Sequence, residues 1–349
     1  MTEMYVLLPG YFEEIVQLVS GRDWLIHNFN TNDLSSIYNP ADYLYNSELE
    51  GVTYRAVLDL NIFQFLVNGA KKKRTHDTYR ATLAFLVLCQ IAEIEMDPTF
   101  AVYERINYNG EYVDEALAEL ELFHNINNAR TDTLAQYALG ALDNIELENK
   151  PEIDRDNLRI ELLRYRRLKD WDSLYLIVLA IIHTYYEDSI PHAAKLTYFV
   201  DWLLREFRLS LPAVVFATRL FGRKPLKRMM KVRPVQGEHE RRSAAFNMTW
   251  DLYLMTRFFA FWTNKTETEE YIFVSDDNAL RSVLRLAISV QQQGGLEPLQ
   301  SYLDPRVWGS VRALLDGRQN RTDRIYGTGE WNPDHRKKLI DQFECSTFS

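Results

Sequence analysis

The hydrophobic pattern changes its period within the stretch Tyr54–Val67. Residues 56–58 form an apolar run that is too short for a helix and suits a buried strand of a parallel sheet. From Ile62 onward, apolar residues return at a spacing of three and four, which predicts a helix. Asp59 stands at the junction, so we expect it at the carboxyl end of a strand, the edge where open α/β sheets bind ligands. A helix N-cap is the alternative interpretation of the same carboxylate.

A second stretch repeats this arrangement near residue 275. The apolar run 271–274 leads into Ser275, Asp276 and Asp277, and the helical spacing that begins at Ala279 predicts the next helix. The carboxyl ends of parallel strands meet at one edge of a sheet. We therefore expect the acids that follow the two strands to converge there.

Two further acids fall on predicted helices. Segment 92–97 alternates like a strand, and the Asp-Pro pair at 97–98 predicts a helix start, with Asp as the cap and Pro in the first helical position. Glu104 then lies about two turns into that helix. Asp251 lies in the early turns of an amphipathic helix expected over 246–260. Both helices could bring their acids to the same sheet edge.

The middle of the chain is strongly helical, with few strand signals and no internal repeat. Amphipathic segments predict helices over 113–125, 132–147, 155–168, 171–186 and 193–207. The histidines of this region lack metal-ligand spacing and are interpreted as ordinary surface or core residues: His124, His183 and His192. The predicted organisation is an N-terminal arm (1–50, with a short helix at 11–19), a core (51–109 and 243–295), a helical insertion (110–242) and a C-terminal extension (296–349).

Composition favours a globular protein over a disordered one. The 349 residues are 46% hydrophobic and 26% charged, and the formal net charge of −9 argues against a wholly basic nucleic-acid binder. Cys89 and Cys345 are too few for a disulfide framework or a zinc site. Cys89 lies in an apolar segment, 79–91, and is expected in the core. No signal peptide or membrane-spanning run is evident, and we expect a cytoplasmic protein.

The strongest local charge anomaly is the basic segment 219–242. Its candidate nucleic-acid contacts are Arg223, Lys224, Lys227, Arg228 and Arg233. Phosphate binding is one interpretation of this crowding, and a solvated helix and loop that balances acidic neighbours is the other. A smaller basic run covers 71–74.

In their order along the chain, these motifs resemble the PIN-domain (PilT N-terminus) family of nucleases, over residues 54–109 and 243–290. The family opens on a hydrophobic-Leu-Asp strand end followed by polar positions, matched by Val-Leu-Asp-Leu-Asn at 57–61. Its second acid is a Glu inside a helix, matched by Glu104, and its third an Asp on a helix before the last motif, matched by Asp251. The last motif, hydrophobic-Thr/Ser-x-Asp, is matched from Val274, with Asp277 in the family's position.

The resemblance implies an α/β fold, namely a PIN-like three-layer α/β/α sandwich with a central, mostly parallel sheet, here with a large helical insertion. It implies a metal-dependent endoribonuclease that hydrolyses RNA phosphodiester bonds. The implied ligands of Mg²⁺ or Mn²⁺ are Asp59, Glu104, Asp251, Asp276 and Asp277. Asn61 and Ser275 would hold the substrate or orient the ligands. Crowded carboxylates raise one another's pKa values unless a cation neutralises them, and hard oxygen ligands suit these two ions.

Several alternatives stay open at this stage. The long helical block departs from the compact family pattern, so Asp97, Glu111 or Glu115 could replace Glu104. The chain could instead be a non-catalytic helical interaction protein with a PIN-like core, whose acids cap helices and whose insertion binds a protein partner or a second copy. A phosphatase-like α/β enzyme also starts from an Asp at a strand end, but no later Lys motif supports it. Metal-dependent RNA cleavage would separate these classes.

Overall fold

A computed structural model describes residues 6–29, 37–72, 76–107, 112–145, 147, 153–164, 170–264, 266, 268–317 and 333–348. The chain divides into two compact units, Met1–Arg166 with Phe258–Arg281 and Arg167–Arg257 with Ser282–Ser349. The elements of the first unit are α1 (Phe12–Ser20), β1 (Leu25–Ile26), α2 (Pro40–Glu50), β2 (Thr53–Leu58), α3 (Leu60–Lys72), α4 (Asp77–Ile91), β3 (Glu95–Asp97), α5 (Thr99–Ile106), α6 (Val113–Asn127), α7 (Thr131–Ala138), α8 (Arg155–Arg164) and β4 (Glu269–Val274).

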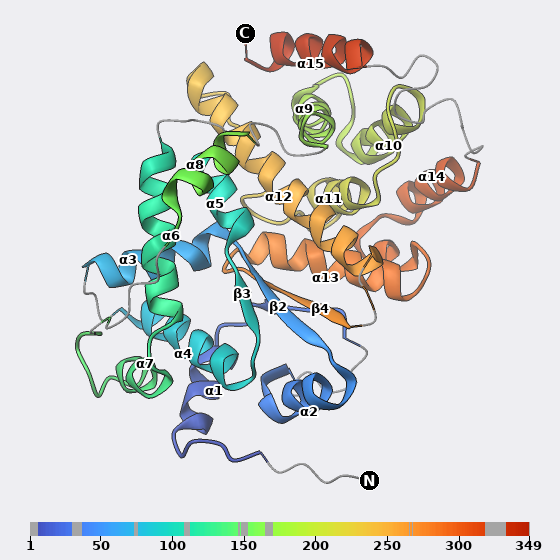
Figure 1. Ribbon diagram of the computed structural model, residues 1–349. Coiled ribbons are helices and arrows are strands. Elements are labelled where there is room, and N and C mark those ends of the chain that lie inside the picture. Colours follow the sequence, from blue (N-terminus) through green and yellow to red (C-terminus); the bar gives the residue numbers. More distant parts are fainter. Residues whose placement is uncertain are drawn as a thin grey trace. The chain divides into compact units, whose positions relative to one another are not determined.

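The first unit contains a small mixed sheet in which β2 lies between β3 and β4 (Figure 1). The strand order is β1-β4-β2-β3, with β2 parallel to both neighbours and β1 antiparallel to β4. Leu58 is paired with Val274, so β2 and β4 end at the same level. The fold is thus mostly helical with a small mixed four-stranded sheet, in which both pairings of β2 are parallel and β2 and β4 end together.

Side chains cover the sheet on both faces. On one face, Leu58 and Val274 join a core that also contains buried residues of α1, α3, α4 and α6. Val57 and Phe273 fall on the opposite face because successive strand residues alternate, and both are buried. Phe273 meets Phe258 of helix α12 (Glu238–Asn264) at a centroid distance of 5.9 Å. The apolar run of β2 is therefore a strand buried on both faces, as its sequence predicts.

The N-terminal residues contribute one strand to the sheet. Leu25 and Ile26 make up β1, which extends the sheet beyond β4. The helix expected at 11–19 is present as α1, and it packs against α4. The start of α5 differs by one residue from the expectation, because Pro98 is the N-cap and the Asp97 carboxylate accepts the Thr99 N–H at 2.9 Å.

Helices form the described part of the second unit. Its elements are α9 (Trp171–Tyr186), a 3-10 turn (His192–Ala194), α10 (Lys195–Arg205), α11 (Leu211–Phe221), a second 3-10 turn (Glu297–Tyr302), α14 (Pro305–Asp316) and α15 (Pro333–Phe348). Helix α9 is buried over nearly its whole length, because α10 and α15 both pack against it. The described parts of the expected extension, 296–317 and 333–348, thus supply helices that pack within this unit.

Two long helices, α12 and α13 (Asn278–Gln292), each contain a boundary between the units. Helix α12 begins at Glu238, eight residues before the start expected from the pattern. Its first turns are charged and lack apolar periodicity, but the Gly237 N–H donates to Glu240 and Arg242 pairs with Glu238 at 3.0 Å. Such contacts begin a helix without an apolar face. Asp251 consequently lies in the middle of α12.

Other predicted helices differ mainly at their ends. The helix expected over 132–147 ends at Ala138, and Gly140 follows with a left-handed φ of +83°. The end of the segment expected over 155–168 lies outside the described residues. Cys89 is buried in α4 as expected, and burial raises the pKa of its thiol. Within the described residues, no helix combines the length and the apolar character needed to cross a membrane.

Candidate functional site at the sheet edge

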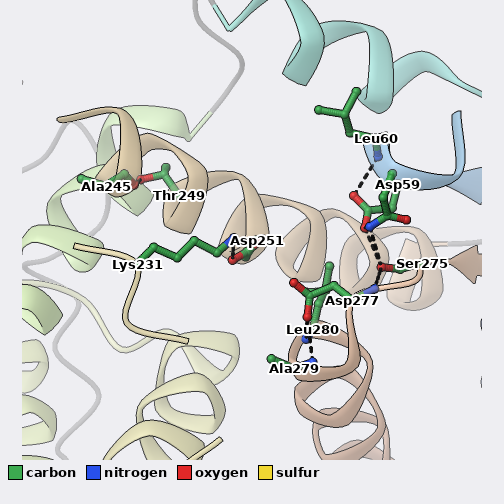
Figure 2. Close-up of polar contacts among 11 residues, drawn as sticks. Asp59, Leu60, Lys231, Ala245, Thr249, Asp251, Ser275, Asp277, Ala279 and Leu280 are labelled. Atoms are coloured by element: carbon green, nitrogen blue, oxygen red, sulfur yellow. Dashed lines mark hydrogen bonds and ion pairs between the residues drawn. The ribbon is translucent and has the colours of Figure 1, made fainter. Parts of the chain in front are cut away.

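Asp59 lies between β2 and α3 with its side chain held on both oxygens. It is only 6% exposed. Its Oδ1 accepts the Leu60 N–H at 2.8 Å, and its Oδ2 accepts the Ser275 hydroxyl and the Asn61 amide, each at 2.5 Å (Figure 2). A buried carboxylate with these donors has a fixed orientation, because each bond constrains the carboxyl plane. Asp59 therefore serves as the N-terminal acceptor of α3 and as the centre of a polar cluster.

Ser275 connects the ends of β2 and β4. Its side chain is fully buried. Its hydroxyl group donates to Asp59, and its oxygen accepts the Asp277 N–H at 3.0 Å. Asn61 adds a second connection, because its Oδ1 accepts the Asp276 N–H at 2.9 Å. The turn after β4 is thereby bonded to the turn after β2. We call these five residues, Asp59, Asn61, Ser275, Asp276 and Asp277, the edge cluster.

Asp277 caps the helix that follows β4. Its Oδ1 accepts the N–H groups of Ala279 and Leu280 at 2.7 and 3.0 Å (Figure 2). Asp276 is exposed, and its Oδ1 accepts the indole N–H of Trp24 at 2.6 Å. Within the described part of the chain, neither Asp276 Oδ2 nor Asp277 Oδ2 has a hydrogen-bond donor. These two oxygens can still accept a ligand.

Two contacts of the edge cluster come from residues that the sequence pattern did not single out. Trp24 binds Asp276 through its indole and accepts the Ser275 N–H on its carbonyl oxygen at 3.2 Å. Arg281, 5% exposed, donates to the carbonyl oxygen of Ser275 at 2.8 Å and also contacts Asn278. Arg281 lies one helical turn after Asp277, a spacing that could have drawn attention to it, whereas Trp24 is 252 residues away from its partner.

The second predicted acid lies on a helix next to β2. Glu104 is half-buried on α5, and α5 packs against both β2 and α3, the two elements that flank Asp59. Of the alternatives to Glu104, Asp97 accepts the Thr99 N–H, Glu115 pairs with Arg105 at 2.8 Å, and Glu111 lies outside the described residues.

Asp251 belongs to the second unit. Its carboxylate pairs with the Lys231 ammonium at 2.6 Å, and both side chains are mostly buried (Figure 2). Lys231 lies in the basic segment, so one of the segment's cations neutralises this acid. A role of Asp251 as a metal ligand stays a prediction.

The candidate nucleic-acid contacts of the basic segment are all exposed. Arg223 is bound to Asp304 through Nε and Nη2, at 3.1 and 3.0 Å. Lys224, Lys227, Arg228 and Arg233 make no ion pair among the residues that the structure describes, and Arg228 has a left-handed φ of +69°. Of the smaller run at 71–74, Lys71 pairs with the buried Glu119, while 73–74 lie outside the described residues. Three of these four cations lie close together in the sequence, at 224–228.

The edge cluster can hold a cation or position a polar group, because its acceptors are carboxylate oxygens on a rigid turn. Across the described ranges, no group of three or more His, Cys, Asp or Glu side chains lies close enough together to hold a metal ion. Comparison with protein-family models, with curated proteins and with solved structures found no match to this chain.

The capping role of Asp277 gives a test of what its charge does. Replacing Asp277 with Ala removes the acceptor for two N–H groups and is expected to lower the free energy of unfolding by about 1 kcal/mol. Replacing it with Asn retains an acceptor, so we expect a change within about 0.5 kcal/mol. Urea unfolding of both variants measures the difference. Equal stability of the Ala variant and the parent would contradict the cap.

Proposed function

We propose that this chain is a metal-dependent endoribonuclease that hydrolyses RNA phosphodiester bonds, built on a PIN-like three-layer core. The proposal is supported by one observation above all. The parallel strands β2 and β4 end together in Asp59 and Asp277, and the Ser275 side chain bonds to both residues. Acids fixed at the carboxyl edge of a parallel sheet lie where α/β folds bind their ligands.

The carboxylate oxygens of the edge cluster suit a hard divalent cation as ligands. Asp276 and Asp277 each keep an oxygen that lacks a donor within the described part, and carboxylate oxygens are ligands that Mg²⁺ and Mn²⁺ prefer. Asp276 and Asp277 would hold the ion through these oxygens. Asp59 and Glu104 are the further ligands of the proposal, although the described residues as they stand form no group of three acids close enough to hold a metal ion. When bound, such an ion supplies Lewis-acid stabilisation of the charge that develops on the phosphate.

The remaining residues would orient the metal ligands and contact the substrate. Ser275 and Leu60 fix the plane of the Asp59 carboxylate through their donors, so this group would need little rearrangement on binding. Asn61 holds the turn at Asp276 and could turn its amide toward the substrate. The exposed cations at 224–228 would contact the nucleic-acid backbone.

A second candidate function is a non-catalytic interaction module with the same core. The observation in its favour is that each acid already has a structural partner: Asp59 accepts the first N–H of α3, Asp277 caps α13 and Asp251 pairs with Lys231. In that case the basic segment would bind a protein partner.

The experiment that separates the two uses the full chain with a labelled single-stranded RNA and a DNA of the same sequence. Each is incubated with Mg²⁺, with Mn²⁺ or with EDTA. Cleavage of RNA that requires the ion supports the nuclease. Binding of Mn²⁺, measured by calorimetry on the parent and on the Asp277→Asn variant, tests the metal site without relying on turnover. Intact RNA in every condition, together with no Mn²⁺ binding, would support the interaction module.

A further inference from the structure

Arg219, in the last turn of α11, is a buried arginine that has no acidic partner among the described residues. It is 7% exposed. Its guanidinium carbon lies 4.1 Å from the centroid of the Tyr302 ring, and its Nη2 donates to the Ser282 hydroxyl at 3.2 Å. Its Nε is buried and has no hydrogen-bond partner among the described residues. The guanidinium is thus held by a ring face and one hydroxyl.

This arrangement is costly for the free protein. Within the described part of the chain, Arg219 makes no ion pair with a carboxylate under a 4.0 Å limit, and burial lowers the pKa of its guanidinium. An arginine remains charged in proteins, so the charge is buried with only weak compensation. Removing a charge from water costs several kcal/mol unless a counter-charge and further hydrogen bonds offset it. Arg219 therefore contributes little to stability and has capacity for an anion.

The surrounding chain adds positive charge beside this group. The Arg223 N–H donates to the Tyr302 carbonyl oxygen at 2.8 Å, so the start of the basic segment lies against Tyr302. A Cβ at Gly222 would come within 2.5 Å of that same oxygen, which requires glycine there. The nearby carboxylate, Asp304, is bound by Arg223. The exposed Lys224 follows directly.

We propose that Arg219, Ser282 and Tyr302 form a binding site for a phosphate oxyanion. A guanidinium presents its donors in a planar fork that matches two phosphate oxygens, and the Tyr302 ring fixes the plane of that fork. Ser282 accepts from Arg219 on its oxygen, so its own proton can be donated to a phosphate oxygen. The exposed cations at 224–228 favour a multiply charged anion over a carboxylate. All three residues lie in the second unit, and the site does not depend on whether the chain cleaves RNA.

The test measures anion binding and stability together. Thermal unfolding of the full chain is recorded in chloride, acetate, phosphate and pyrophosphate at matched ionic strength. Phosphate and pyrophosphate are expected to raise the Tm of the parent, because a ligand that binds only the folded state stabilises that state. Acetate is expected to leave the Tm unchanged. In Arg219→Met, the shift should vanish, and affinity measured by calorimetry should fall about tenfold or more. Without phosphate this variant should be at least as stable as the parent.

Arg312→Met is the matched control. Arg312 lies in the same unit and faces a ring, Trp308 at 6.0 Å, but it is exposed and pairs with Asp316. The control removes the same charge and should retain the phosphate shift. Ser282→Ala, a smaller change, keeps the test valid if Arg219→Met does not fold, and it should weaken phosphate binding several-fold. The proposal is overturned if the parent shows no phosphate-specific shift, or if Arg219→Met or Ser282→Ala keeps the parental affinity.

A further measurement distinguishes two possible ligands, the phosphodiester of a nucleic acid and a small phosphate compound. A single-stranded oligonucleotide is titrated onto the parent and the Arg219→Met variant in EDTA, which prevents metal-dependent cleavage. A loss of oligonucleotide affinity in the variant identifies a phosphodiester as the ligand. A loss of phosphate and pyrophosphate binding with unchanged oligonucleotide affinity identifies a small phosphate compound. Either result supports the anion site, and failure of RNA cleavage affects neither.

Discussion

Replacing Asp59 with Asn is expected to abolish Mg²⁺- or Mn²⁺-dependent cleavage of RNA. The substitution removes one ligand charge at almost constant volume. It also replaces one acceptor oxygen by an NH₂ group. Both oxygens of Asp59 accept hydrogen bonds, one from Leu60 and the other from Asn61 and Ser275, so the new NH₂ group must face a donor. A donor facing a donor in a buried cluster costs about 1–3 kcal/mol. The variant should therefore remain folded but with a lower free energy of unfolding.

The measurement is the rate of RNA cleavage with saturating ion, together with urea unfolding at a temperature where the variant is folded. Asp42→Asn is the control, because Asp42 is an exposed acid in the first turn of α2 in the same unit. It should leave both rate and stability close to the parent. An Asp59→Asn variant that cleaves as fast as the parent would rule out the edge cluster as the catalytic site.

The sheet edge was predictable because its signal is local. In β2 and β4, a short apolar run passes directly into a polar residue and then into helical spacing, and both changes of period are visible within about fifteen residues. Parallel pairing of two such strands places Asp59 and Asp277 at one edge without further information. The capping alternative is equally local, and the structure bears it out for both acids.

The remaining contacts depend on partners that are distant in sequence. Strand β1 has two residues, too few for any periodic pattern, and exists because β4 offers it an edge. Trp24 reaches Asp276 only through that pairing. Asp251 has no local feature that indicates Lys231, and Arg219 none that indicates Tyr302, because each pair forms through the packing of the second unit. Sequence periodicity describes single elements and carries no information about such partners.

Removing three neighbouring cations of the basic segment is expected to weaken RNA binding strongly and to reduce its salt dependence. The variant carries Gln at Lys224, Lys227 and Arg228, which are exposed and without ion pairs in the described part of the chain. Each phosphate contact with a single strand contributes about 0.7 to the slope of log affinity against log salt, so three lost contacts flatten it by about 2. Stability should change by less than about 0.5 kcal/mol, because these side chains are at the surface.

Two controls show whether the effect belongs to this segment. The first control is a triple variant that makes the same change of net charge elsewhere in the second unit. It carries Gln at three exposed cations, Arg306, Lys337 and Lys338. Its effect on the slope should be small. The second control is Arg223→Gln, which removes a cation that Asp304 already neutralises. It should affect the slope less than a single Gln substitution at Lys224, Lys227 or Arg228. Affinity is measured at several salt concentrations in EDTA, which separates binding from cleavage. A slope that is unchanged in the triple variant would assign the segment to a solvated face or to a protein partner, and would favour the interaction module over the nuclease.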